Sequence, residues 1–182
     1  MNKKIKTLLI GGNIWYFGEG MFGPLFAVFA DKVGGNILDI TWAWATYLIV
    51  SGVLVIFVGA LADKVSKEKL MLAGYGLNAA FTFCYVLVQS PFHLFLVQGG
   101  LGVAAALAVP TWNALYDMSQ KDKTKKAYTW GLATGQFQII TGVAIVIGGL
   151  IVSNFSFTAL FLTMGIIQVI AMIYQLRILK LV

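Results

Sequence analysis

The sequence predicts an all-α integral membrane protein with six transmembrane helices. Hydrophobic residues make up 59% of the 182 residues and charged residues only 11%, a balance outside the usual range of soluble globular domains. The net charge is +6, but the charges lie in short clusters between apolar runs, where they indicate membrane topology rather than a nucleic-acid-binding surface. The runs are also too long and continuous for a membrane β-barrel, whose strands alternate in polarity over about 10 residues.

Six apolar stretches reach the roughly 20 residues that a helix needs to cross the hydrocarbon core. They span residues 8–29, 41–62, 70–89, 94–116, 127–152 and 157–175. The first stretch follows a lysine cluster, as a signal peptide would, but it contains no clear cleavage site with small residues, so we interpret it as a retained helix. The connections are short, and residues 1–182 are expected to form one transmembrane domain.

The lysine and arginine residues predict the orientation of the chain. All but one of the 13, Lys32 being the exception, fall on one side of the six stretches. They form clusters at residues 3–6, 64–69, 121–126 and 177–180. By the positive-inside rule this side is cytoplasmic, so both termini are predicted to be cytoplasmic in the cell membrane.

A weak internal repeat divides the chain near its middle. Pro24 and Asp31 recur with the same spacing as Pro110 and Asp117, and residues 59–64 have a degenerate echo in residues 149–154. The repeats then cover about residues 1–90 and 91–182. Because each contains three helices, an odd number, the second repeat must be inverted in the membrane relative to the first.

The charged loop between the second and third stretches, residues 59–69, carries the most specific motif. Its glycine allows close helix approach, its aspartate can face a helix N-terminus, and its lysines hold the turn at the cytoplasmic side. With this loop the chain resembles the major facilitator superfamily, whose signature is Gly-x-Leu-Ala-Asp-Arg-x-Gly-Arg-Arg. The matching residues are Gly59, Leu61, Ala62, Asp63, Lys64 and Lys67. Ser66 replaces a glycine of the motif and Glu68 a basic residue. The resemblance implies that Gly59, Asp63, Lys64 and Lys67 form a gating loop, whereas the motif alone would also suit an ordinary positive loop.

The resemblance covers half of a usual family member. Members normally have twelve helices in two six-helix halves, with the substrate cavity between them. The six helices of this chain supply one wall, so we expect a parallel two-fold homodimer that works by alternating access. A fragment of a twelve-helix parent and a half that pairs with a different chain remain the alternatives. The ending at residues 180–182, which lacks the long basic linker between halves, favours a complete small protein.

Glu19 is the candidate proton-coupling residue. It lies about 16 Å along the first helix, at 1.5 Å per residue, and thus near the bilayer midplane. A carboxylate at that depth costs about 2.5 to 3.5 kcal/mol and usually faces a cavity or a partner. Burial favours its neutral form, so it can bind and release a proton near neutral pH. A protonated glutamate that only packs against a neighbouring helix is the alternative. The resemblance implies coupling, because acidic residues on this helix recur among proton-driven symporters and antiporters.

The candidate substrate-binding residues are aromatic or carry an amide. They are Trp15, Tyr16, Gln98, Trp112, Asn113 and Gln138. Gln98 begins a Gln-x-x-x-Gly pattern where the family often has Arg-x-x-x-Gly, so Glu19 has no evident cationic partner. The fifth helix likewise lacks the proline of the antiporter motif. Trp42, Trp44 and Trp130 lie near segment ends and are interpreted as interfacial residues.

These residues favour transport of a small organic solute. Amides suit neutral hydroxylated solutes, and aromatic faces stack on sugars or cations, so a sugar-like solute is preferred and multidrug or cation efflux is the alternative. A non-transporting subunit that pairs with another chain is the other possibility. The lone Cys84, in an apolar run, and the lack of a metal-ligand cluster or nucleophile with a base predict no enzyme, no cofactor and no metal.

Overall fold

The computed structural model describes residues 2–120 and 123–181, which form seven α-helices and three short 3-10 helices. Lys121, which belongs to the third basic cluster, lies outside the described residues. The α-helices are α1 (Lys3–Gly20), α2 (Leu25–Lys32), α3 (Ile37–Ala62), α4 (Lys67–Cys84), α5 (Pro91–Met118), α6 (Lys126–Asn154) and α7 (Phe157–Gln175). The 3-10 helices are η1 (Tyr85–Leu87), η2 (Lys123–Lys125) and η3 (Leu176–Leu181). The predicted all-helical class is confirmed.

Side-chain caps start most of the long helices where the apolar runs begin. The Asn36 side chain accepts from the backbone N–H groups of Leu38 and Asp39, and the Asp39 carboxylate accepts from the Asn36 N–H, which completes a capping box at α3. Ser66, Ser90 and Ser156 cap α4, α5 and α7 in a similar way. Such caps satisfy backbone donors that would otherwise lack a partner at the membrane boundary.

Among the described residues, five helices are long and apolar enough to cross a membrane: α3, α4 with η1, α5, α6 and α7 with η3. The predicted first stretch, residues 8–29, is interrupted, because α1 ends at Gly20 and α2 begins at Leu25. Pro24 cannot donate a backbone hydrogen bond, and Gly20 and Gly23 flank it, so the helix is weak at this point. Pro110, its counterpart in the repeat, lies inside the continuous helix α5 among good helix formers.

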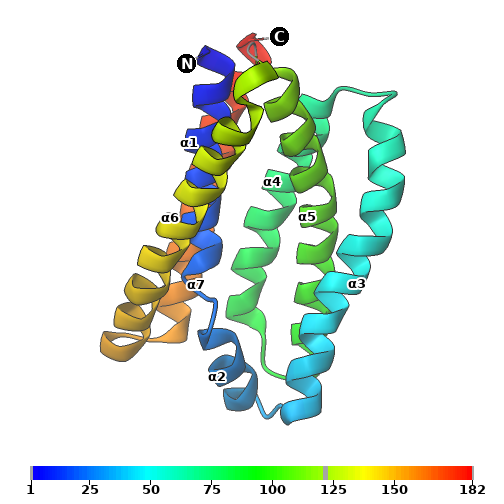
Figure 1. Ribbon diagram of the computed structural model, residues 1–182. Coiled ribbons are helices and arrows are strands. Elements are labelled where there is room, and N and C mark those ends of the chain that lie inside the picture. The colour runs from blue at the N-terminus through cyan, green and yellow to red at the C-terminus, as the bar shows by residue number, and fades with distance from the viewer. Residues whose placement is uncertain (1, 121–122, 182) are drawn as a thin grey trace.

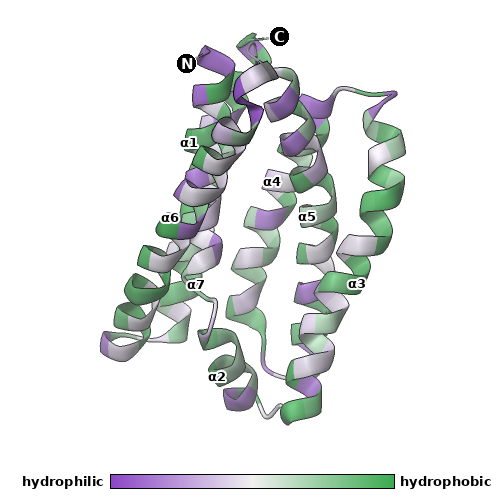
Figure 2. Ribbon diagram, in the orientation of Figure 1, coloured by the Kyte–Doolittle hydropathy of each residue, from purple (hydrophilic) through white to green (hydrophobic). Residues whose placement is uncertain are grey.

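The helices run up and down between two ends, and both termini lie at the same end (Figure 1). Helix α5 packs against α3 and α4, α1 packs against α6 and α7, and α4 contacts α7. Hydrophobic residues cover the helices along their lengths, whereas hydrophilic residues gather mainly at the end that holds the termini (Figure 2). Helices α3 and α6 keep many large apolar side chains exposed, as a membrane-embedded surface requires.

Two buried clusters divide the interior by depth. One contains Phe22, Phe29, Tyr85 and Phe161 and lies toward α2. The other contains Leu8, Trp15, Met71 and Trp112 and lies toward the termini. On α1, α4 and α7 the boundary between the clusters falls at residues 16–20, 76–84 and 165–170. This boundary layer carries the polar side chains described next.

Candidate functional site

The predicted coupling residue Glu19 is held by two amide side chains in the layer between the clusters. Asn78 Nδ2 on α4 donates to Glu19 Oε1 at 2.7 Å, and Gln168 Nε2 on α7 donates to the same oxygen at 3.3 Å. The Gln168 amide also donates to the carbonyl oxygen of Trp15, at 3.1 Å. Asn78 and Gln168 are 2% and 0% exposed, so the three helices meet at a buried polar contact.

Glu19 has no cationic partner among the described residues, as the sequence indicates. The ion pairs that those residues form all lie near the end of the bundle that holds the termini, and none includes Glu19. Two neutral amides are therefore its hydrogen-bond partners. Donors of this kind can hold the carboxylate in place and still leave it free to exchange a proton, since they carry no compensating charge.

A small cavity of about 100 Å³ lies beside Glu19, on the α2 side. Gln98 and Thr82 line it together with Tyr47 and Tyr85. The Thr82 hydroxyl is buried and has no hydrogen-bond partner. A cavity of this size has room for a few water molecules, which could satisfy that hydroxyl. Gln98 therefore belongs to the surroundings of Glu19 and not to the larger cavity described below.

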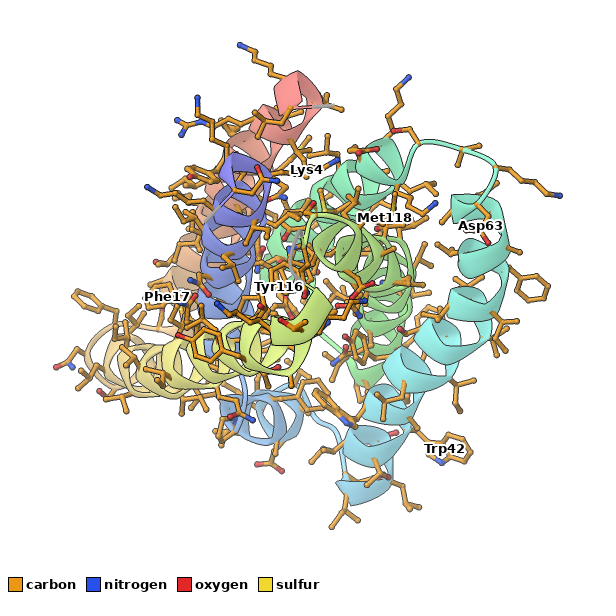
Figure 3. The ribbon with its side chains drawn as sticks, turned by 45° about the horizontal axis from the view of Figure 1, so that its top comes forward. Lys4, Phe17, Trp42, Asp63, Tyr116 and Met118 are labelled. Carbon is orange, nitrogen blue, oxygen red and sulfur yellow. The ribbon has the colours of Figure 1, made fainter. Side chains whose placement is uncertain are left out.

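A larger cavity of about 470 Å³ lies on the side of the termini and contains the other five predicted substrate residues. Trp15 and Tyr16 come from α1, Trp112 and Asn113 from α5, and Gln138 from α6. In the view of Figure 3, Tyr116 lies at the centre of the bundle close to this cavity, whereas Trp42 and Asp63 lie at the outer edge on α3 and its C-terminal end.

Aromatic contacts give this cavity rigid walls. The rings of Trp15 and Tyr75 are 4.4 Å apart, and those of Tyr16 and Phe137 are also 4.4 Å apart. Trp112 packs edge-on against Phe137, and its indole Nε1 donates to the Leu8 carbonyl at 3.1 Å. Because the Trp112 N–H already donates to Leu8, Trp112 can contact a solute with its ring face but has no hydrogen-bond donor left for it.

The polar groups of the cavity are amides and hydroxyls. Asn113 and Gln138 are exposed to it and form no hydrogen bond with described residues, and Thr134 and Thr141 also line it. No charged residue lines the cavity. The described residues also contain no group of three His, Cys, Asp or Glu side chains that could hold a metal ion. The cavity can therefore bind a solute through ring faces and neutral hydrogen bonds.

Sequence reasoning missed several residues of the candidate site. Asn78 and Gln168, the partners of Glu19, lie within α4 and α7, where it proposed no site at membrane depth. Trp130, interpreted as an interfacial residue, lines the larger cavity and packs against Tyr116 with ring centroids 5.0 Å apart. Trp44, interpreted in the same way, lines the smaller cavity. For Asn78 and Gln168 the sequence did offer a signal, because an amide side chain in an otherwise apolar membrane helix is costly unless it has a hydrogen-bond partner.

The predicted gating loop forms a charged turn at the end of the bundle that holds the termini. Lys67 Nζ lies 3.6 Å from Asp63 Oδ1 and donates to the Ala62 carbonyl at 2.6 Å. Lys64 is exposed, and a side chain at Gly59 would meet open space. Glu68, which departs from the family motif, pairs with Lys4 of α1 at 3.0 Å and so ties the loop to the first helix.

Comparisons with known proteins agree with this architecture. Residues 8–181 match the family model of the Major Facilitator Superfamily. The multidrug resistance protein MdtG of Enterobacter lignolyticus is 21% identical over 177 residues, which cover 94% of this chain and 42% of that protein. An uncharacterized MFS-type transporter of Methanocaldococcus jannaschii is 22% identical over 95% of this chain and 45% of its own length. The methylenomycin A resistance protein of Streptomyces coelicolor is 24% identical over 75% of this chain and 29% of its own length.

The chain thus spans less than half the length of these curated relatives. The match nevertheless covers nearly all of the chain and includes the charged loop, both cavities and all seven α-helices. With five helices long and apolar enough to span a membrane among the described residues, the chain is a multi-pass membrane protein. The chain belongs to the Major Facilitator Superfamily.

Proposed function

We propose that this chain is one six-pass body of a proton-coupled secondary transporter for small organic solutes. The observation that supports the proposal is a carboxylate at membrane depth that is held by neutral amides. It lies about one helical turn from Tyr16, which lines an uncharged, aromatic-walled cavity. A proton on Glu19 and a solute in the cavity would then be close enough to influence each other through α1.

The six passes would be α1 with α2, then α3, α4, α5, α6 and α7. Their contacts support two inverted repeats, at about residues 1–90 and 91–182. The packing of α5 against α3 and α4 corresponds to that of α1 against α6 and α7 when each pass is exchanged for its counterpart three passes along. The contact between α4 and α7 corresponds to itself under this exchange. With both termini at the lysine-rich end, the positive-inside rule makes that end cytoplasmic.

The second wall of the cavity would come from a second copy of the chain in a parallel two-fold dimer. Helices α3 and α6 are the least buried of the apolar helices. Both contain glycines whose Cβ positions meet open space, Gly52 and Gly59 on α3 and Gly131 and Gly135 on α6. Such positions permit close helix contact within a membrane. A longer parent chain or a different partner could use the same surface.

We expect Gly52→Leu to weaken the dimer without unfolding the chain. A leucine there has space within the protomer but would hold a partner helix away, at a cost of about 1 to 3 kcal/mol, or roughly a 5-fold to 150-fold loss in dimer affinity. Dilution of labelled protein in lipid vesicles, read by energy transfer, measures the dissociation constant. Ala60→Leu is the control, since it adds bulk on α3 about 80° away from Gly52. A monomer in the unaltered protein, or equal effects of both variants, would contradict the proposed dimer.

The lining favours a lipophilic solute with aromatic or cationic character. Six aromatic residues face the larger cavity: Trp15, Tyr16, Tyr75, Trp112, Trp130 and Phe137. Two relatives are named for multidrug and methylenomycin A resistance, in keeping with such a solute. A neutral sugar-like solute is the second candidate, because the amides of Asn113 and Gln138 are free to bind hydroxyl groups.

Transport by reconstituted protein in vesicles with a pH gradient distinguishes these candidates. We expect flux of a lipophilic fluorescent cation, competed by other drugs, and a loss of roughly 5-fold to 30-fold in Trp112→Ala, since removal of a ring face that binds a cation costs about 1 to 2 kcal/mol. Flux of a radiolabelled sugar that Asn113→Ala abolishes would support the second candidate. If the chain alone binds and moves neither class of solute, it is a subunit that needs another chain. Trp42→Ala, on the outer edge of α3, is the matched aromatic control.

A further inference from the structure

The corner where the two ends of the chain meet carries a cluster of cations. The first turns of α1 pack beside η3, and a cavity of about 380 Å³ lies against them. Its lining includes Lys3, Lys6, Thr7, Tyr174, Arg177 and Lys180. The lining contains four basic residues and no acidic one. In Figure 3 the start of α1 and the C-terminal segment lie near each other, and long side chains with nitrogen ends spread from this region.

The four cations of this corner differ from other lysines at the same end of the bundle. Lys4, Lys67 and Lys126 each have a carboxylate partner, Glu68, Asp63 and Asp117 respectively. By contrast, Lys3, Lys6, Arg177 and Lys180 form no ion pair with any described residue. Arg177 lies over the Tyr174 ring at 4.5 Å, which orients its guanidinium group without neutralising its charge. The described residues of this corner therefore carry four basic side chains without a carboxylate partner.

The start of α1 adds to the positive potential. Its first turn contains no acidic residue, and two of the four cations, Lys3 and Lys6, lie near the positive end of the helix dipole. Cations at that position are unfavourable unless an anion lies close by. The corner is also at the end of the apolar helices, level with the phospholipid headgroups of the leaflet on the side of the termini.

We propose that this corner binds the phosphate group of an anionic phospholipid. Lys6, Arg177 and their neighbours would donate hydrogen bonds to the phosphate oxygens, with Arg177 able to bind two of them at once. The apolar surface of α7 and η3 continues from the corner through Ile170, Ile173 and Leu176, which are 49%, 60% and 40% exposed. This surface can accommodate the acyl chains, which favours a lipid over free phosphate. The proposal does not depend on which solute is transported.

Native mass spectrometry of the full chain with defined lipids tests the site. We expect the unaltered protein to retain phosphatidylglycerol in preference to phosphatidylcholine. Each basic residue that lies beside the bound headgroup contributes about a fivefold factor to the binding of an anionic lipid, so Lys6→Gln/Arg177→Gln should weaken phosphatidylglycerol binding by about 25-fold. Lys64→Gln/Lys69→Gln removes the same charge from exposed lysines of the loop and should leave this binding unchanged.

Three outcomes would overturn the proposal. Equal loss in both double variants would show that diffuse surface charge holds the lipid. No preference for phosphatidylglycerol over phosphatidylcholine would remove the lipid site. Inorganic phosphate that binds the unaltered protein and displaces all of the phosphatidylglycerol would identify a free-anion site. If Lys6→Gln/Arg177→Gln does not fold, Lys3→Gln/Lys180→Gln tests the same cavity from its other two cations.

Discussion

Replacing Glu19 by glutamine is expected to abolish solute transport driven by a pH gradient while leaving the fold intact. The glutamine carbonyl oxygen can still accept hydrogen bonds from Asn78 and Gln168 at nearly the same positions. It cannot, however, bind and release a proton at any physiological pH. We expect the initial rate of gradient-driven flux in vesicles to fall by roughly a hundredfold or more, the scale of losing a proton-transferring side chain.

Two controls define what this result would mean. Asp31→Asn makes the same chemical change at an exposed residue near the end of α2 and should leave flux unchanged. Asn78→Leu removes one of the amide donors but keeps the carboxylate, so it should alter the pH dependence of flux rather than abolish coupling. Gradient-driven flux that persists unaltered in Glu19→Gln would remove Glu19 from the coupling mechanism, and the family assignment would stand.

A methyl group at Gly148 is expected to destabilise the protein strongly, whereas one at Gly149 is not. A Cβ at Gly148 on α6 would overlap the Met21 carbonyl group and lie 2.9 Å from the Met21 Cα. This is backbone at the break between α1 and α2, which cannot move aside as a flexible side chain would. A Cβ at Gly149 would meet nothing within 4 Å. We therefore expect Gly148→Ala to cost about 1 to 3 kcal/mol or more.

The midpoint of thermal unfolding, measured in detergent or nanodiscs, checks this prediction. Gly149→Ala should be neutral or slightly stabilising, by up to about 1 kcal/mol, because alanine favours the helix more than glycine does. Since the two glycines are adjacent on one helix, a change in helix propensity alone would affect both equally. Equal unfolding midpoints for the two variants would therefore contradict the close approach of α6 to the break.

Much of the fold could be predicted because the features that identify a membrane helix are local in the sequence. An apolar run of the right length, bounded by a cap and a charge, predicts a helix, and α7 begins and ends where the sequence places it, at residues 157–175. The break in the first helix was not predicted, since residues 8–29 were expected to form one helix. Both Pro24 and Pro110 are bordered by apolar sequence, yet only the helix that contains Pro24 is interrupted. The glycines beside Pro24 and the approach of α6 decide that difference, and the second of these is a tertiary contact.

The candidate site was predictable in part for a similar reason. Glu19 stands out in any membrane helix because its charge is costly there. Its partners, Asn78 and Gln168, do not stand out in the sequence. They contact Glu19 only because α4 and α7 are rotated about their own axes so that these side chains face α1. That rotation is set by how Tyr75, Phe161 and their neighbours pack above and below the polar layer. Gln98, which the sequence groups with the other substrate candidates, lines the smaller cavity, because helical spacing fixes its face but not its depth relative to α1.

The break at residues 21–24 divides the first pass into two helical segments. The longer segment, α1, packs against α6 and α7, and the shorter segment, α2, contacts α3. The backbone hydrogen bonds across this break include those from Phe22 N to Glu19 O, at 3.4 Å, and from Phe26 N to Phe22 O and Gly23 O. If α1, α6 and α7 tilt relative to α3, α4 and α5, the backbone can therefore bend at this break without unfolding α1 or α2. Because the Glu19 carbonyl accepts a hydrogen bond across this break, such a tilt would change the distance between the Glu19 carboxylate on α1 and Asn78 on α4, whereas Gln168 lies on α7, which packs with α1. Under the proposed function, this change in hydrogen bonding would couple the tilt of the helices to proton binding at Glu19.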